Sequence, residues 1–177
     1  MSEIRIASRY AKSLIKLSSD QGSLEKVYED IQLISDTAIQ NHELVAMLKS
    51  PVIKADTKLS ILKSIFKTCT PLTIQFLEKV IDAKRENIMV EITHQFISFY
   101  NNIKGIAVAN VTSAMPLGET SINKIKAYIS EKINKSQINL TLKVDPKIIG
   151  GLVINYEDKL LDMSIKSELH KLKQSLN

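Results

Sequence analysis

The spacing of apolar residues in the first hundred positions predicts a series of amphipathic helices. In the first helix, apolar side chains recur every three or four residues, which places them on one helical face. They are Ile4, Ala7, Tyr10, Ala11, Leu14 and Leu17. Ser23 is the expected N-cap of a second helix with a single narrow apolar stripe, the pattern of a helix in a bundle. That stripe contains Leu24, Val27, Ile31, Ile34 and Ala38.

Proline marks the ends and starts of the helices that follow. A short helix over His42–Lys49 ends before Ser50-Pro51, because proline disfavours helix in the residue before it. A fourth helix extends from Ala55 to Cys69, and Thr70-Pro71 provides a cap and a first position for the fifth. A sixth helix carries Ile88, Ile92, Phe96, Phe99 and Ile103. Six helices with short links predict an antiparallel six-helix bundle over residues 1–104.

The pattern changes at Lys104-Gly105 and predicts a small α+β domain over residues 105–177. A β-branched strand over 106–112 is followed by a helix that begins at Gly118. Residues 138–144 alternate between apolar and polar side chains, as in a strand with one buried face. Gly150-Gly151 precede a further strand, Glu157-Asp158 form a tight turn, and Ser164 caps a last helix. Because the predicted six-helix bundle makes up most of the chain, the expected fold class is mainly α, with the small α+β domain at the C-terminal end.

Composition agrees with a folded, largely helical protein. Of the 177 residues, 44% are apolar and 24% are charged, and there are only 5 Gly and 4 Pro. The single cysteine, Cys69, excludes an internal disulfide, and we interpret it as a buried apolar residue of the fourth helix. We find neither a membrane-spanning stretch nor a signal peptide, so we expect the protein on the cytoplasmic side of the membrane.

Charge leaves one alternative open. The net charge is +5, with 14 basic against 12 acidic residues in 1–104 and 10 against 7 in 105–177. Lys84-Arg85 is the only adjacent basic pair. Nucleic-acid-binding proteins usually concentrate positive charge on one face. Because folding can gather distant cations into a patch, a basic helical nucleic-acid-binding adaptor remains the alternative function.

The sequence offers little for catalysis. His42, His94 and His170 have no second histidine or cysteine at metal-ligand spacing, so we expect no metal site. Gly150-Gly151 lack the Lys and Ser or Thr of a phosphate-binding loop, and we interpret them as a kink or close contact. No carboxylate pair lies in an apolar setting that would raise its pKa. We therefore expect a protein that is not an enzyme and holds no cofactor.

The apolar surfaces of the first and last helices are the remaining candidate sites. The first helix is apolar over more than one stripe, so one part can fill the core while another lines a groove. Small residues such as Ala7 and Ala11 would let a partner helix approach. A fully buried helix shows the same pattern, and the last helix could equally cover the small sheet.

Several short strings recur in order over almost the whole chain. They are Arg9–Leu14, Leu48–Pro51, Lys84–Ile88, Val111–Leu117, Val144–Ile154 and Asp162–Ile165 with Leu169. In their order and spacing these strings resemble the δ subunit of bacterial F-type ATP synthase, the counterpart of the mitochondrial oligomycin-sensitivity-conferring protein. Two departures are Glu157-Asp158, where the family usually has Gly-Asp, and Lys166, where arginine is common.

The resemblance implies a non-catalytic clamp within the synthase, present as a monomer. The N-terminal bundle would hold the N-terminal helices of α subunits, and the C-terminal domain would hold the C-terminal helices of b subunits. The protein would then lie on the cytoplasmic face of the bacterial plasma membrane and meet the membrane only through the complex.

The resemblance places the α-subunit contact on the first and fifth helices. We expect Tyr10, Ala11 and Leu14 to contribute from the first helix, and spacing adds Phe76 and Val80 from the fifth. For the peripheral stalk we expect Ile165, Leu169 and Leu172 of the last helix.

Overall fold

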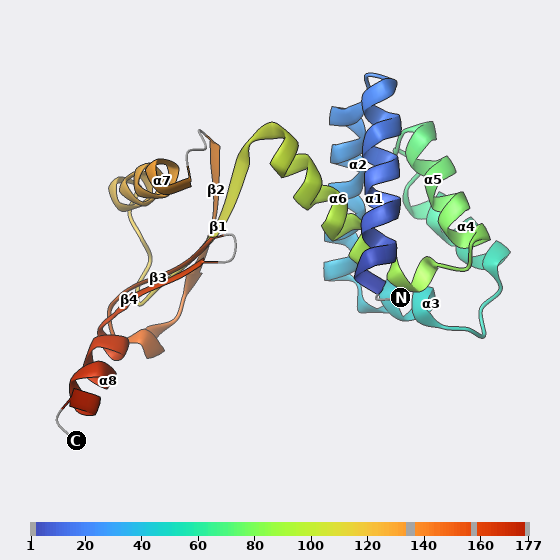
Figure 1. The fold of residues 1–177 in the computed structure, drawn as a ribbon. Coiled ribbons are helices and arrows are strands. Elements are labelled where there is room, and N and C mark those ends of the chain that lie inside the picture. Colours follow the sequence, from blue (N-terminus) through green and yellow to red (C-terminus); the bar gives the residue numbers. More distant parts are fainter. Residues whose placement is uncertain (1–2, 134–136, 157–158, 176–177) are drawn as a thin grey trace. The chain divides into compact units, whose positions relative to one another are not determined.

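The computed structural model describes residues 3–133, 137–156 and 159–175 (Figure 1). The chain divides into two compact units, Met1–Tyr100 and Asn101–Asn177. The division falls inside a helix, shortly before the change of pattern at Lys104-Gly105. The described residues are mainly helical, and a small sheet lies in the C-terminal part, as the sequence predicts.

The N-terminal unit contains helices only, in the part of the chain that the structure describes (Figure 1). They are α1 (Glu3–Asp20), α2 (Leu24–Gln40), α3 (His42–Lys49), α4 (Ala55–Ile65), α5 (Pro71–Asp82), the 3-10 turn η1 (Glu86–Ile88) and α6 (Met89–Lys104). Helix α2 contacts α1, α3 and α5, and α4 packs on α5. Helix α2 is therefore central to the unit.

The core of this unit follows the predicted helical spacing, with exceptions at the ends of the stripes. Ala7, Ala11 and Leu14 of α1 are buried, whereas Ile4 and Leu17 are exposed. In α2, the buried side chains are Val27, Ile31, Ile34, Ser35 and Ala38. Periodicity alone therefore overestimates the burial of residues at the ends of this stripe.

Two local predictions at the helix ends were confirmed only in part. Ser23 is the N-cap residue of α2 as predicted, but its side chain makes no cap hydrogen bond and instead donates from its hydroxyl to the carbonyl oxygen of Ser18 at 3.4 Å. Helix α4 ends at Ile65, so Cys69 lies in the following turn, although it is buried as expected. The apolar spacing continues past the helix because Phe66 and Cys69 both reach the core from the turn.

A carboxylate of α2 fixes the start of α5. Thr70 caps α5 as predicted, with Pro71 at the first helical position. Asp30 Oδ2 accepts hydrogen bonds from the Thr70 backbone N at 2.8 Å and from the hydroxyls of Thr70 and Thr73, each at 2.7 Å. A charged acceptor with three donors is stronger than a neutral cap, so α5 begins at a defined point on α2.

The C-terminal unit combines a four-stranded sheet with helices (Figure 1). Its elements are β1 (Ile106–Ser113), α7 (Glu119–Ile133), β2 (Gln137–Val144), the 3-10 turn η2 (Pro146–Ile148), β3 (Gly151–Tyr156), β4 (Lys159–Ser164) and α8 (Ile165–Ser175). The strand order is β2-β1-β3-β4. Strands β1 and β2 are parallel, which requires the crossover that α7 supplies, and the other pairs are antiparallel. The predicted Glu157-Asp158 turn lies outside the described residues.

Helix α7 and one face of the sheet form the core of this unit. Its buried members are Ala107, Ala109, Val111, Ile125, Ile129, Ile138, Ile154 and Tyr156. The predicted buried face of 138–144 holds only in part, because Leu142 and Val144 are 44% and 48% exposed. Strand β2 is at the edge of the sheet, and these two residues lie outside the core cluster.

Gly150 and Gly151 permit close packing, as the sequence suggests. Gly151 has φ +76°, and a Cβ there would overlap the carbonyl oxygen of Met163 on the paired strand β4. A Cβ on Gly150 would lie 2.6 Å from Cδ1 of Ile165. The two glycines therefore allow β3 to pair with β4 and the first residue of α8 to pack over the turn.

Candidate partner-binding surfaces

Tyr10 of α1 and Phe76 of α5 form the part of the predicted α-subunit site that reaches the surface. Their rings contact each other edge to face, with centroids 6.3 Å apart and planes at 71°. Both side chains are half-buried. An aromatic pair in edge-to-face contact keeps a fixed shape, and its uncovered area is available to an apolar partner.

The other three predicted residues of this site lie inside the N-terminal unit. Ala11 and Val80 have no exposed surface, and Leu14 is 1% exposed. Ala7 is also fully buried, so the small side chains of α1 serve packing within the chain itself. Ala11, Leu14 and Val80 therefore belong to the core of the N-terminal unit and not to its surface.

Three further apolar residues of α1 and α5, which were not among the predicted site residues, lie on the same helical faces as this aromatic pair. Ile6 and Leu17 share a face of α1 with Tyr10 by helical spacing, and Leu72 lies one turn before Phe76. Leu17 is exposed, whereas Ile6 and Leu72 are half-buried. The helical spacing of apolar residues that identified Tyr10 and Phe76 could also have identified these three positions. We call Ile6, Tyr10, Leu17, Leu72 and Phe76 the α1/α5 surface.

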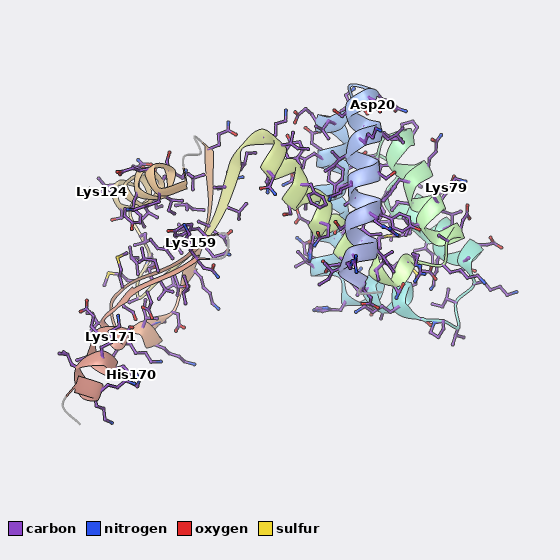
Figure 2. All side chains as sticks on the ribbon, in the orientation of Figure 1. Asp20, Lys79, Lys124, Lys159, His170 and Lys171 are labelled. Carbon is purple, nitrogen blue, oxygen red and sulfur yellow. The ribbon has the colours of Figure 1, made fainter. Side chains whose placement is uncertain are left out.

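The apolar face of α8 is exposed. Ile165, Leu169 and Leu172 follow at steps of four and three residues and are 44%, 53% and 59% exposed. None of them belongs to the core cluster under α7, although α8 contacts β4 and η2. The Ser164 hydroxyl accepts from the Ser167 backbone N at 3.2 Å and caps α8 as predicted. Figure 2 shows His170 and Lys171 on the same helix.

A second apolar surface of the C-terminal unit lies between α7 and the sheet. A hollow of about 210 Å³ is lined by Lys124, Ile125, Tyr128, Leu152, Ile154 and Met163. Tyr128 and Met163 are 38% and 45% exposed. Lys124, labelled in Figure 2, is its one charged lining residue among those described. The hollow is small and open, and we assign it no ligand.

The titratable groups serve structure. Burial raises the pKa of the Cys69 thiol to about 12, and the nearby charge and hydrogen bond of Asp30 add to this, so the thiol stays protonated and unreactive. Burial alone would raise the pKa of Glu86, but hydrogen bonds, led by that from Lys58, hold it below its ordinary value. Within residues 3–133, 137–156 and 159–175, we find no group of three or more possible metal ligands.

No helix in the described ranges combines the length and apolar character that crossing a membrane demands.

Comparisons with known proteins identify the family. The family described as "ATP synthase delta (OSCP) subunit" matches residues 6–176. The ATP synthase subunit delta of Cytophaga hutchinsonii is 36% identical over 174 residues, covering 98% of this chain and 94% of that protein. The subunit delta of Amoebophilus asiaticus is 38% identical over 174 residues, with 98% and 95% covered.

A solved structure shows the same fold. A chain of the Toxoplasma gondii mitochondrial ATP synthase hexamer superposes with a TM-score of 0.78 at 20% identity, covering 96% of each chain. The family match and the bacterial relatives extend over nearly the whole chain, and both units are included. The chain therefore belongs to the OSCP family of ATP synthase delta subunits.

Proposed function

We propose that this chain clamps the catalytic head of an F-type ATP synthase to the C-terminal helices of the b subunits. Family membership makes it a non-catalytic stator subunit of the synthase. Rotation in the membrane sector exerts torque on the head, which would turn with the rotor unless it were held. The subunit must therefore stay bound under load, and it needs no chemistry of its own.

The N-terminal unit is the proposed contact with the head. Six helices, α1 to α6, would act as an antiparallel bundle, and the α1/α5 surface would receive the N-terminal helix of an α subunit. The half-buried contact of Tyr10 with Phe76 is the observation that carries this proposal. Aromatic side chains that are partly exposed above a packed core are frequent hot spots of protein interfaces. Ala11, Leu14 and Val80 would contribute by holding the two helices in place.

The exposed stripe of α8 is the proposed contact with the peripheral stalk. Ile165, Leu169 and Leu172 present an apolar face of a helix, the kind of surface that packs against helices such as the C-terminal ends of b subunits. Two sites on one chain make the second contact intramolecular once the first has formed. The clamp would therefore persist even if each contact alone were weak.

This assignment also proposes a location. As part of the synthase the protein is peripheral to the membrane, and we place it as a monomer on the cytoplasmic face of the bacterial plasma membrane. The nucleic-acid-binding alternative gains no support from the family match or from the relatives.

Binding of an α-subunit peptide tests the head contact. A peptide copying the N-terminal helix of the α subunit from the same organism is titrated calorimetrically into the full chain. We expect binding that Phe76→Ala weakens by at least about tenfold, as truncation of an aromatic hot spot does. The matched control is Ile39→Ala, because Ile39 is 61% exposed on α2. Absence of binding to the wild-type chain, or equal loss in both variants, would contradict the assigned surface.

A further inference from the structure

Helix α1 carries four cations in line on its outer face. Arg5, Arg9, Lys12 and Lys16 are separated by four, three and four residues, and all four are exposed. Such spacing aligns side chains along one side of a helix, here over about 16 Å at a rise of about 1.5 Å per residue. In the linear sequence no two of them are adjacent, so charge counting does not reveal them. We call these four residues the basic row.

The basic row lies opposite the buried face of α1. The buried residues Ala7, Ala11, Leu14 and Ser18 have the same four, three, four spacing, displaced by two positions. Two positions correspond to roughly half a turn, so the cations point away from the core. Tyr10 lies between these two faces and belongs to the α1/α5 surface. The basic row is thus distinct from the proposed head contact.

These cations lack carboxylate partners within the described part of the chain. The ion pairs found there are Lys58–Glu86, Lys63–Glu78 and Lys79–Asp82, and none includes a residue of the row. Lys12 Nζ lies 5.1 Å from the ring centroid of Phe99 on α6, a contact that leaves its charge uncompensated. Asp20, at the next position of the stripe and labelled in Figure 2, ends the row.

Two residues of the basic row line a surface depression. Arg5 and Arg9 line a depression of about 300 Å³ between α1 and α6, together with Ile4, Ser8 and Gln95. The amide Nε2 of Gln95 donates to Glu91 Oε1 at 3.0 Å, so this neighbouring carboxylate is already engaged on α6. The depression therefore offers guanidinium and hydroxyl groups, which suit a carboxylate side chain.

We propose that the basic row binds an acidic helical segment of another subunit, with Asp or Glu at the same four, three, four spacing. A partner helix has the repeat needed to place one carboxylate beside each cation. The row is one side chain wide, whereas a membrane surface or a nucleic acid would engage a broader basic patch. This contact goes beyond the proposed head and stalk contacts and does not depend on the α1/α5 surface.

Zero-length coupling in the assembled synthase tests the proposal. A carbodiimide joins a lysine amine to a carboxylate that it touches, and peptide mapping identifies both. We expect Lys12 or Lys16 to be coupled to an Asp or Glu in a helical segment of another subunit, with coupling that falls as salt rises. Lys67, exposed just after α4, is the control. Coupling of Lys12 and Lys16 no greater than that of Lys67 would overturn the proposal.

A charge-matched pair of variants provides a second test on the full chain. The probe is a synthetic helical peptide with Glu at the stated spacing, compared with its Gln analogue by fluorescence anisotropy. R5Q/R9Q/K12Q/K16Q should bind the Glu peptide roughly tenfold more weakly, as expected for four exposed ion pairs. The control K124Q/K126Q/K166Q/K173Q loses the same charge from exposed positions of the C-terminal unit and should bind as the wild type does.

Three results would contradict the basic row as a helix site: equal losses in both variants, equal binding of the Glu and Gln peptides, or tighter binding of RNA or of phosphatidylglycerol vesicles than of the Glu peptide. The α-subunit peptide test at Phe76 has a separate outcome, because none of the substituted cations belongs to the α1/α5 surface.

Discussion

At the scale of single residues, Lys58 shows how a buried charge joins three segments of the N-terminal unit. Its side chain is 2% exposed, and its Nζ lies 2.9 Å from both the carbonyl oxygen of Leu48 and Oε1 of Glu86. Leu48 is near the end of α3, and Glu86 begins η1. The two strings Leu48–Pro51 and Lys84–Ile88, which carried part of the family resemblance, are therefore linked through one lysine of α4.

Removing the carboxylate should destabilise this unit. Glu86→Gln leaves a buried ammonium with a weaker acceptor, and we expect a loss of about 2 kcal/mol in the free energy of unfolding. Urea unfolding followed by circular dichroism measures it. The control is Glu78→Gln, because Lys63 and Glu78 are 47% and 34% exposed, far more than Lys58 and Glu86, and their pair should contribute less than about 1 kcal/mol. Equal losses in the two variants would show that the burial of Lys58 is unimportant.

The same carboxylate should make stability depend on pH. The pKa of Glu86 is lowered in the folded chain, so its contribution is present above the unfolded pKa of about 4.3 and is lost as pH falls through the folded value. The stability difference between the wild type and Glu86→Gln should therefore be largest near neutral pH and shrink below about pH 4. Unfolding midpoints measured from pH 7 to pH 3 check this. A difference that stays constant over the range would mean that ionisation of Glu86 contributes nothing.

At the scale of elements, Gly151 determines whether β3 and β4 can pair. Gly151→Ala forces a Cβ onto the Met163 carbonyl at a positive φ, and we expect a loss of at least about 2 kcal/mol from the C-terminal unit. Thermal unfolding measures the effect. Gly118→Ala is the matched control, because a Cβ at Gly118 meets nothing within 4 Å. If both variants unfolded at the same temperature as the wild type, the hairpin would tolerate a side chain at Gly151.

Element identity could be predicted well from periodicity, whereas element ends and edge positions could not. Thr70-Pro71 carry their own start signal, and the start of α5 was predicted correctly. Nothing local indicates that α4 stops at Ile65, because Phe66 and Cys69 still point into the core from a turn. Likewise, alternation predicts a strand for β2 but does not reveal that it is an edge strand. Burial at such positions depends on tertiary neighbours, which a single sequence does not display.

Site residues were predicted less completely than the fold, for the same physical reason. The period that identified Tyr10 also identified Ala11 and Leu14, and only packing separates the half-buried ring from the two buried side chains. On α8 all three predicted residues of the stripe are exposed. A stripe therefore indicates a contact surface only where the rest of the fold leaves it uncovered.

At the scale of the whole molecule, the two proposed contacts act in series. Torque on the head reaches the stalk only if both the α1/α5 surface and the α8 stripe hold, so losing either contact should release the head. A charge at Ala11 would not test this, because that residue is fully buried and the N-terminal unit would unfold. Half-buried Phe76 and exposed Leu169 are suitable positions, since a charge there meets the partner and leaves the core intact.

We therefore expect Phe76→Asp and Leu169→Asp each to lower ATP-driven ion pumping in membrane vesicles several-fold while ATP hydrolysis continues. Once one contact is lost the head is already released, so loss of the second contact should have no further effect. The double variant should therefore pump no less than the more strongly impaired of the two single variants. Ile39→Asp, at an exposed position of α2, should leave pumping unchanged. If the reduction in the double variant equalled the product of the two single reductions, the two contacts would contribute independently. If pumping were unchanged in both single variants, the assignment of the α1/α5 surface and the α8 stripe as partner contacts would be contradicted. A series connection would also account for the division of one small chain into two compact units, since each could be suited to its own proposed partner while the covalent link between them transmits the load.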